Sequence, residues 1–227
     1  MRRNVSLEEI SDGRLYGPND MVKADCHGCK GCHKCCTGMG HSVLLDPYDV
    51  YRMQLGLGKG LAQLLAEEAV ELNVAEGVIL PNVKMAGKEE RCAFLDEEGR
   101  CGIHEHRPGV CRLFPLGRYY ENGDFRYFLQ TGECVDSNRS KVKVCKWIDT
   151  PDQGRNHDFI CKWHYLVNGL EDAVAEARDM DLAKRLNMLM LQTFYLEPYD
   201  GEEDFYGQFA KRLRHYEAAV AGLPGDE

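Results

Sequence analysis

Cysteines are the residues of this sequence whose type and spacing most clearly indicate chemistry. Five lie within residues 26–36 and four more follow singly, and the nine are Cys26, Cys29, Cys32, Cys35, Cys36, Cys92, Cys101, Cys111 and Cys134. The thiolate is the metal-binding form of cysteine, and thiolates this close repel one another unless a cation neutralises them. We therefore predict that these nine cysteines are metal ligands, and that their metal holds the glycine-rich loop over residues 25–41 in shape.

The first run of cysteines has the C-x2-C-x2-C-x3-C spacing with which bacterial ferredoxins hold [4Fe–4S] clusters, and it consists of Cys26, Cys29, Cys32 and Cys36. The register of this run is ambiguous, because the same spacing recurs one step later and ends at Cys35. Thr37 also stands where ferredoxins have proline. Nine thiolates suffice for two four-thiolate sites, so we expect one or two [4Fe–4S] clusters.

The adjacent pair Cys35 and Cys36 carries a separate expectation. Neighbouring side chains diverge in an extended backbone. We therefore expect the two side chains to diverge, so that the two sulfurs serve different centres or one of them binds no metal.

Zinc is the alternative metal. A structural zinc ion takes four ligands in a closed tetrahedron, and such sites usually pair two C-x2-C knuckles. A second, distant knuckle is missing from this sequence, whereas cysteines three residues apart suit a cubane better. Histidines could complete a zinc site, which keeps this alternative open: His27, His33, His104 and His106.

The cysteine pattern resembles that of the YkgJ-type cysteine-cluster family, whose motif is CxxCxxCC. The matching cysteines are Cys29, Cys32, Cys35 and Cys36, and a second similar block comprises residues 92–95, 101–104 and 107–115. The resemblance implies zinc or iron chelation and no settled reaction. A related cysteine-cluster region occurs in flagellin lysine methyltransferases, so the resemblance also allows a cluster-containing, protein-modifying enzyme.

The composition and the missing motifs exclude several classes of function. The net charge of −9 argues against a nucleic-acid partner, and the longest apolar runs are too short for a membrane span. The N-terminus has no apolar signal region, so we expect a cytoplasmic protein with reduced thiols. Phosphate-binding glycine loops and hydrolase motifs are missing, so we assign no catalytic residue and leave open whether the protein is an enzyme.

Two arginines and two further cysteines are the remaining candidate residues for the metal site. Arg107 and Arg112 flank Cys111 and could offset the negative charge of a metal centre. Cys145 and Cys161 are weaker ligand candidates, and Cys161 fits a buried core thiol within a helix.

The elements that must position these residues alternate short helices and hairpins before residue 150. We predict helices over 7–10, 47–55 and 60–70, a strand pair over 71–84, hairpins over 92–104 and 119–127, and a half-buried strand over 139–146. Apolar residues three and four apart then predict helices over 157–178, 180–194 and 203–221.

The expected fold is therefore α+β, with a small cysteine-rich metal-binding domain over residues 1–150 and a helical C-terminal extension over residues 151–227. The favoured function is redox or electron transfer with an unidentified redox partner protein. A zinc-held adaptor module and a methyltransferase are the alternatives, and the sequence leaves the oligomeric state open.

Overall fold

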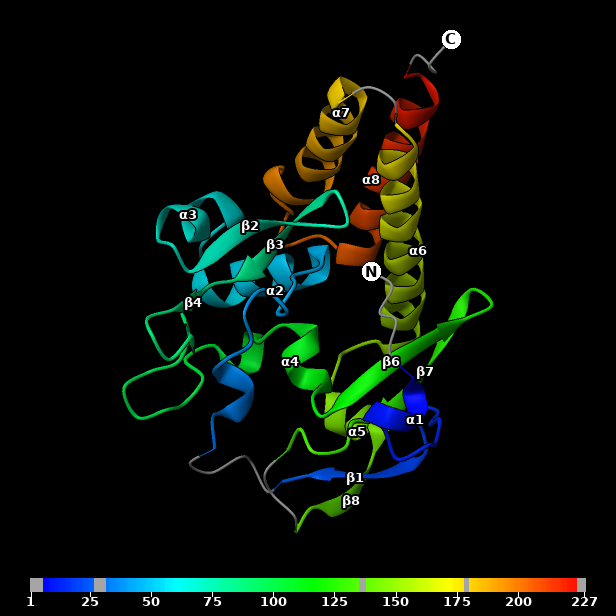
Figure 1. Cartoon of the computed structure of the whole chain (residues 1–227). Helices are drawn as coiled ribbons and strands as arrows, with labels where there is room; N and C mark the ends of the chain where they lie inside the picture. Colours follow the sequence, from blue (N-terminus) through cyan, green and yellow to red (C-terminus); the bar gives the residue numbers. More distant parts are fainter. Residues whose placement is uncertain (1–5, 27–31, 135–137, 178–179, 224–227) are drawn as a thin grey trace.

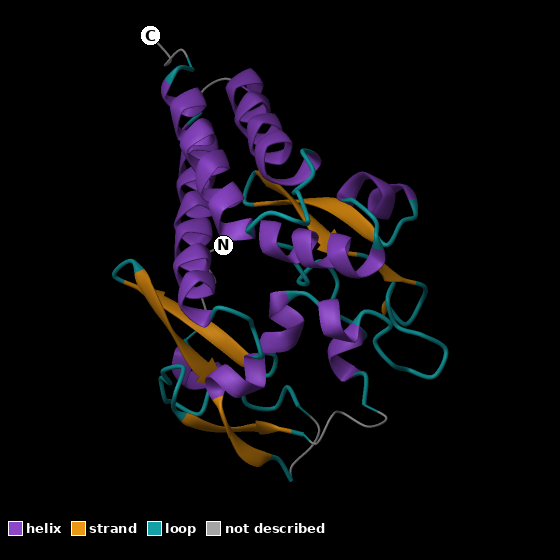
Figure 2. Ribbon diagram, turned by 180° about the vertical axis from the view of Figure 1, so that it is seen from behind, coloured by secondary structure: helices purple, strands orange, loops and turns teal. Residues whose placement is uncertain are grey.

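The computed structural model describes residues 6–26, 32–134, 138–177 and 180–223, and it confirms an α+β fold with a helical C-terminal region (Figures 1 and 2). Its α-helices are α1 (Leu7–Ile10), α2 (Pro47–Leu57), α3 (Leu61–Ala66), α4 (Gly109–Leu113), α5 (Val144–Ile148), α6 (Gln153–Glu176), α7 (Met180–Leu191) and α8 (Phe205–Ala221). Tighter 3-10 turns form η1 (Lys34–Cys36) and η2 (His104–His106), and a π-helical turn, η3 (Gln192–Leu196), follows α7.

The strands form two-stranded antiparallel pairs, β1–β8, β2–β3, β4–β5 and β6–β7. Their bounds are β1 (Met21–Asp25), β2 (Val70–Ala75), β3 (Val78–Val83), β4 (Met85–Ala86), β5 (Arg91–Cys92), β6 (Leu116–Glu121), β7 (Asp124–Leu129) and β8 (Ser140–Lys143). Within the described residues, no helix has the length and apolar character needed to cross a bilayer.

Two predicted turns are confirmed by their backbone angles. Glu76 and Gly77 have φ angles of 50° and 79°, and Asn122 and Gly123 have φ angles of 53° and 81°. Two consecutive positive φ angles match the twist of tight hairpins, so β2–β3 and β6–β7 form around these pairs.

The helix predicted from Pro47 is also confirmed. The Asp46 carboxylate accepts a hydrogen bond from the Asp49 N–H at 2.8 Å, and the Asp49 carboxylate accepts one from the Asp46 N–H at 3.1 Å. This reciprocal cap satisfies two backbone donors at the start of α2, and Pro47 at the first position needs none. Gly58, with a φ angle of 66°, ends the helix.

Two expected strands differ from the structure. Over residues 92–104 only the isolated bridge Leu95–Cys101 forms, because the Asp96 carboxylate accepts hydrogen bonds from the N–H groups of Glu98 and Arg100 and closes a tight loop. Cys92 instead pairs with Met85 across β5 and β4. The strand expected over 139–146 ends at Lys143, where α5 begins.

The main hydrophobic core contains residues from both sides of residue 150. Apolar side chains of α2, β2 and β3 pack with an aromatic set from the C-terminal helices, namely Phe159, Trp163, Phe194, Phe205 and Phe209. A smaller second core lies around β1 and α5 and includes Val22, Ala24, Leu116 and Val144. The C-terminal helices therefore pack on the cysteine-rich part, while the division into two domains at residue 150 stays a prediction.

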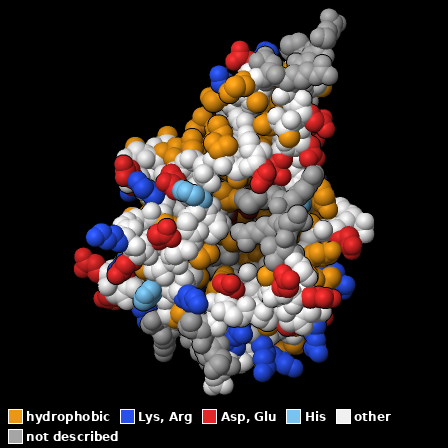
Figure 3. Space-filling model, viewed as in Figure 1, with side chains coloured by type: hydrophobic (Ala, Val, Ile, Leu, Met, Phe, Trp, Pro, Cys, Tyr) orange, Lys and Arg blue, Asp and Glu red, His pale blue; other side chains and the backbone are white. Residues whose placement is uncertain are grey.

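Asn187 of α7 ties the β2–β3 hairpin to the helices. Its side-chain oxygen accepts a hydrogen bond from the Ile79 N–H at 2.7 Å, and its amide donates to the Gly77 carbonyl at 3.0 Å. Asn187 is buried, so these bonds fix how the hairpin lies on α7. On the face shown in Figure 3, acidic and basic side chains are interspersed, with hydrophobic side chains exposed among them.

Candidate metal centre

The adjacent cysteines Cys35 and Cys36 lie in the 3-10 turn η1. The turn is closed by a 2.8 Å hydrogen bond from the Cys36 N–H to the His33 carbonyl. The two sulfur atoms are 3.9 Å apart. The expectation that these side chains diverge is therefore wrong, because the backbone is turned here and not extended.

Hydrogen bonds hold η1 against the strand that carries Cys92. The Gly38 N–H donates to the Glu90 carbonyl at 3.0 Å, and Thr37 forms a β-bridge with Arg91. This backbone pairing brings Cys35 and Cys36 to β5, although more than fifty residues separate them from Cys92 in the sequence.

Cys92 and Cys101 have the same local arrangement. Burial raises the pKa of each thiol, while a backbone N–H two residues ahead, from Phe94 for Cys92 and from Ile103 for Cys101, donates to the sulfur and favours the thiolate. A 2.8 Å hydrogen bond from the Gly102 N–H to the Phe94 carbonyl joins the two segments. At both cysteines a backbone N–H therefore favours the thiolate, which is the form that binds a metal cation.

Cys111 is positioned by α4. The Gly109 N–H at the start of this helix donates a 2.7 Å hydrogen bond to Oδ1 of Asp49 in α2, so Asp49 anchors the turn that carries the cysteine. Burial raises the pKa of Cys111 well above its ordinary value, and negative charge at Cys35 and Cys92 raises it further.

Five thiols from these segments act electrostatically on one another, and we call them the cysteine group: Cys35, Cys36, Cys92, Cys101 and Cys111. A hydrogen bond from the Cys36 thiol lowers the pKa of Cys35 to about 7, and the same bond raises the pKa of Cys36. The Cys35 thiol is therefore partly ionised at neutral pH, whereas the raised pKa values of the other four thiols mean that their thiolates need a cation nearby.

Arg107 supplies positive charge to the cysteine group. Its guanidinium lowers the pKa values of Cys35 and Cys101. Arg112, the other predicted arginine, is buried with the Asp49 carboxylate, whose charge opposes the lowering of its pKa by burial. Arg107 thus offsets thiolate charge as predicted, while Arg112 belongs to the anchor of α4.

The other predicted ligands stay predictions. Cys29 and His27 lie outside the described residues. Cys26 is buried directly after β1, and Cys32 and Cys134 are partly exposed. None of the ten described cysteines forms a disulfide.

Among the described histidines of the predicted set, His33 lies beside Gly99 and His106 beside Gly56. A Cβ added to Gly99 would come within 3.2 Å of His33 Nδ1, and one added to Gly56 would overlap the His106 ring. Burial and the charge of Arg107 lower the pKa of His104.

Asp49 is the functional residue that sequence reasoning missed. Its place three residues after Asp46 predicts the helix cap. Its bond to Gly109 links positions 60 residues apart, so no local pattern indicates it.

Comparison with known proteins agrees with this centre. Residues 28–135 match the model of the CxxCxxCC family, described as "Putative zinc- or iron-chelating domain". No curated protein and no solved structure matches the chain. Each member of the cysteine group lies within the matched segment. The match to the CxxCxxCC family thus covers residues 28–135, just under half of this chain, and it supports metal binding by the cysteines of that segment.

Proposed function

We propose that the cysteine group holds an iron–sulfur cluster of the [4Fe–4S] type and that the protein carries electrons. The observation that supports this most is the convergence of five thiols from η1, β5, the 95–101 loop and α4. Four thiolates suffice for one such cluster. When bound, the cluster would supply a one-electron redox couple.

The spread of the sulfurs supports a polynuclear centre. Thiolates around one zinc ion, with bonds of about 2.3 Å, would lie about 3.8 Å from one another. Across the described residues, three ligand atoms come within 4.8 Å of one another in a single place, and that place is outside the cysteine group. Among the described residues, therefore, no three sulfurs of the cysteine group lie as close together as the ligands of one zinc ion would.

The surroundings suit a redox centre. The N–H groups of Phe94 and Ile103 point at sulfurs, and Arg107 adds positive charge. Hydrogen bonds and positive charge beside the sulfurs favour the more negatively charged, reduced state and so raise the reduction potential.

One observation favours zinc as the second candidate. The 3.9 Å between the sulfurs of Cys35 and Cys36 is close to the edge of a zinc–thiolate tetrahedron. A zinc ion held by this pair and two other members of the group would make the region a structural module, which unfolds when the metal is removed.

Metal and sulfide analysis of anaerobically purified full-length protein decides between these candidates. We expect about four iron and four acid-labile sulfide per cluster, with a visible absorption band that dithionite bleaches. Cys101→Ser and Cys111→Ser should lose most of the iron, while Cys145→Ser, outside the cysteine group, should keep it. A colourless protein with zinc and no sulfide would refute the iron–sulfur proposal.

A further inference from the structure

A second set of metal-ligand side chains meets between the β6–β7 turn and α6. Asp124 is the first residue of β7, and His157 and Cys161 belong to α6. Their ligand atoms all lie within 4.8 Å of one another, which within the described residues is true of no other three histidine, cysteine or acidic side chains. We call these residues the Asp–His–Cys trio.

Local structure explains why the trio forms. His157 and Cys161 are four residues apart, so they lie on one face of α6. The hairpin turn is held against the same helix, because the Gly123 N–H donates a 3.0 Å hydrogen bond to the Tyr165 hydroxyl. Asp124 follows this turn directly and therefore faces α6.

The distances within the trio are short. Nε2 of His157 lies 2.6 Å from Oδ1 of Asp124, and the Cys161 thiol donates to the same oxygen at 3.9 Å. The His157 ring stacks on Phe125 with 4.3 Å between ring centroids, which fixes the orientation of the imidazole. The three ligand atoms are thus brought together and oriented by the protein itself.

Imidazole nitrogen, carboxylate oxygen and thiolate sulfur are together the ligand types that zinc prefers. Bonds of about 2.0–2.3 Å to a shared ion would place such atoms roughly 3.3–3.8 Å apart, within the span of the trio. We propose that Asp124, His157 and Cys161 bind a single Zn²⁺ ion, separate from the centre held by the cysteine group. This assignment does not depend on which metal the cysteine group binds.

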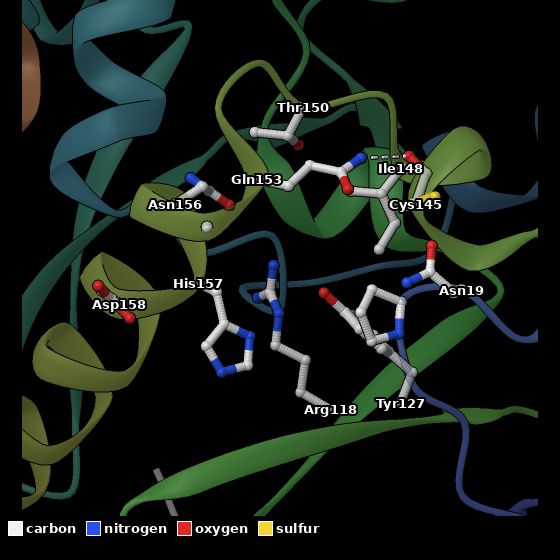
Figure 4. A pocket seen from close by; sticks show the side chains of 12 residues that line it. Asn19, Arg118, Tyr127, Cys145, Ile148, Thr150, Gln153, Asn156, His157 and Asp158 are labelled. Atoms are coloured by element: carbon white, nitrogen blue, oxygen red, sulfur yellow. Dashed lines mark hydrogen bonds between the residues drawn. The ribbon is translucent and has the colours of Figure 1, made fainter.

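Three protein ligands leave one zinc position for an outside ligand. His157 also lines a cavity of about 350 Å³ together with Arg118, Tyr127 and Asn156. Figure 4 shows the guanidinium of Arg118 between His157 and Tyr127, facing the start of α6. A water molecule or small anion therefore has room beside the trio.

Charges around Cys161 come from both hairpin and helix. The carboxylates of Asp124 and Asp158 favour a cation there, whereas Arg118 opposes it and favours the thiolate. With the thiolate formed, the carboxylates of Asp124 and Asp158 and the Cys161 sulfur place negative charge around the site, which favours a divalent cation.

Zinc uptake by the full-length, cluster-loaded protein tests the proposal. Equilibrium dialysis against Zn²⁺ followed by elemental analysis should give one more zinc per chain for the wild type than for His157→Gln or Cys161→Ser. Cys145→Ser is the matched control and should keep the extra zinc. Equal zinc in the wild type and both trio variants, with iron unchanged and normal circular dichroism, would overturn the assignment.

Peptide mapping after alkylation gives a readout specific to Cys161. Zn²⁺ should protect the Cys161 thiol from N-ethylmaleimide at least about tenfold in the wild type, and His157→Gln should abolish the protection. Unprotected Cys161 in zinc-saturated wild type would also refute the site. Because the comparison is made at one residue, the result is independent of whether the cysteine group holds iron or zinc.

Discussion

The N–H of Gly109 donates a 2.7 Å hydrogen bond to Oδ1 of Asp49, and this bond joins the start of α4 to the first turn of α2. Asp49 is buried, and its second carboxylate oxygen caps α2 through the Asp46 N–H. This one carboxylate therefore bonds to the start of α2 and to the start of α4. It thereby positions Cys111 relative to the other thiols.

Removal of this carboxylate should loosen the metal centre. Asp49→Ala leaves the Gly109 N–H without its partner and removes the carboxylate charge that acts most strongly on Arg112. We expect a loss of about 1–3 kcal/mol in the free energy of unfolding, measured by urea titration, and reduced iron per chain. Asp49→Asn keeps an oxygen acceptor and should retain more iron than Asp49→Ala. Unchanged iron in Asp49→Ala would show that Asp49 does not position Cys111.

The stability of the fold should decrease as pH rises toward 8. Burial and the neighbouring charge of Asp49 raise the pKa of Asp46 to about 8 from an ordinary value of 3.8. Between these values the folded chain keeps a proton that the unfolded chain has released, so stability falls with rising pH, by at most ~1.4 kcal/mol per pH unit for one proton.

Urea titrations from pH 5 to pH 9 measure this dependence. Asp46→Asn keeps the oxygen that caps α2 but cannot ionise, so its stability should change less over this range than that of the wild type. Asp181→Asn, at an exposed position on α7, should behave like the wild type. A wild-type stability that rises between pH 5 and pH 8 would contradict the prediction.

Cys35 should be the most reactive member of the cysteine group in metal-free protein. Its pKa of about 7 makes it partly ionised at neutral pH, whereas the pKa values of Cys92, Cys101 and Cys111 are raised. Since the thiolate is the nucleophile, alkylation at Cys35 should rise steeply as pH passes 7. Arg107→Ala should raise this pKa and slow the reaction at pH 7, with Arg100→Ala as the control. Mass spectrometry of alkylated peptides at several pH values measures both effects.

The hydrogen bonds of Asn187 should increase the free energy of unfolding. Asn187→Leu has a similar size but leaves the Ile79 N–H and the Gly77 carbonyl without a partner. We expect a loss of about 1–3 kcal/mol in the free energy of unfolding by urea titration. Met188→Ala, at a position 54% exposed on the same helix, should change it little. An equal effect of the two substitutions would mean that the buried amide contributes nothing specific.

Local signals in the sequence predicted local structure well. The Asn122–Gly123 turn and the Asp46 cap depend only on neighbouring residues. The positions of the β6–β7 hairpin and of α2 could therefore be predicted from the sequence. The cysteine pattern also predicted a metal-chelating segment, which the family match supports, because metal ligands recur in short motifs.

Pairings between distant segments could not be predicted in this way. β1 pairs with β8 across more than a hundred residues, and Asp49 binds Gly109, without a repeated pattern to show either contact. The Asp–His–Cys trio has a local signal only in the four-residue spacing of His157 and Cys161. The error at Cys35 and Cys36 arose from assuming extended backbone in a loop that contains a 3-10 turn.

The distance along the chain between the members of the cysteine group has a consequence for biosynthesis. Cys35 and Cys111 lie about 75 residues apart, and a centre that joins them closes a loop for which chain entropy would contribute roughly 4–5 kcal/mol, as for a cross-link of that length. A ribosome exposes Cys35 long before Cys111, so during translation the early thiols have to remain reduced and unfilled, or hold metal only in part. The proposed centre would be completed only after α4 has emerged.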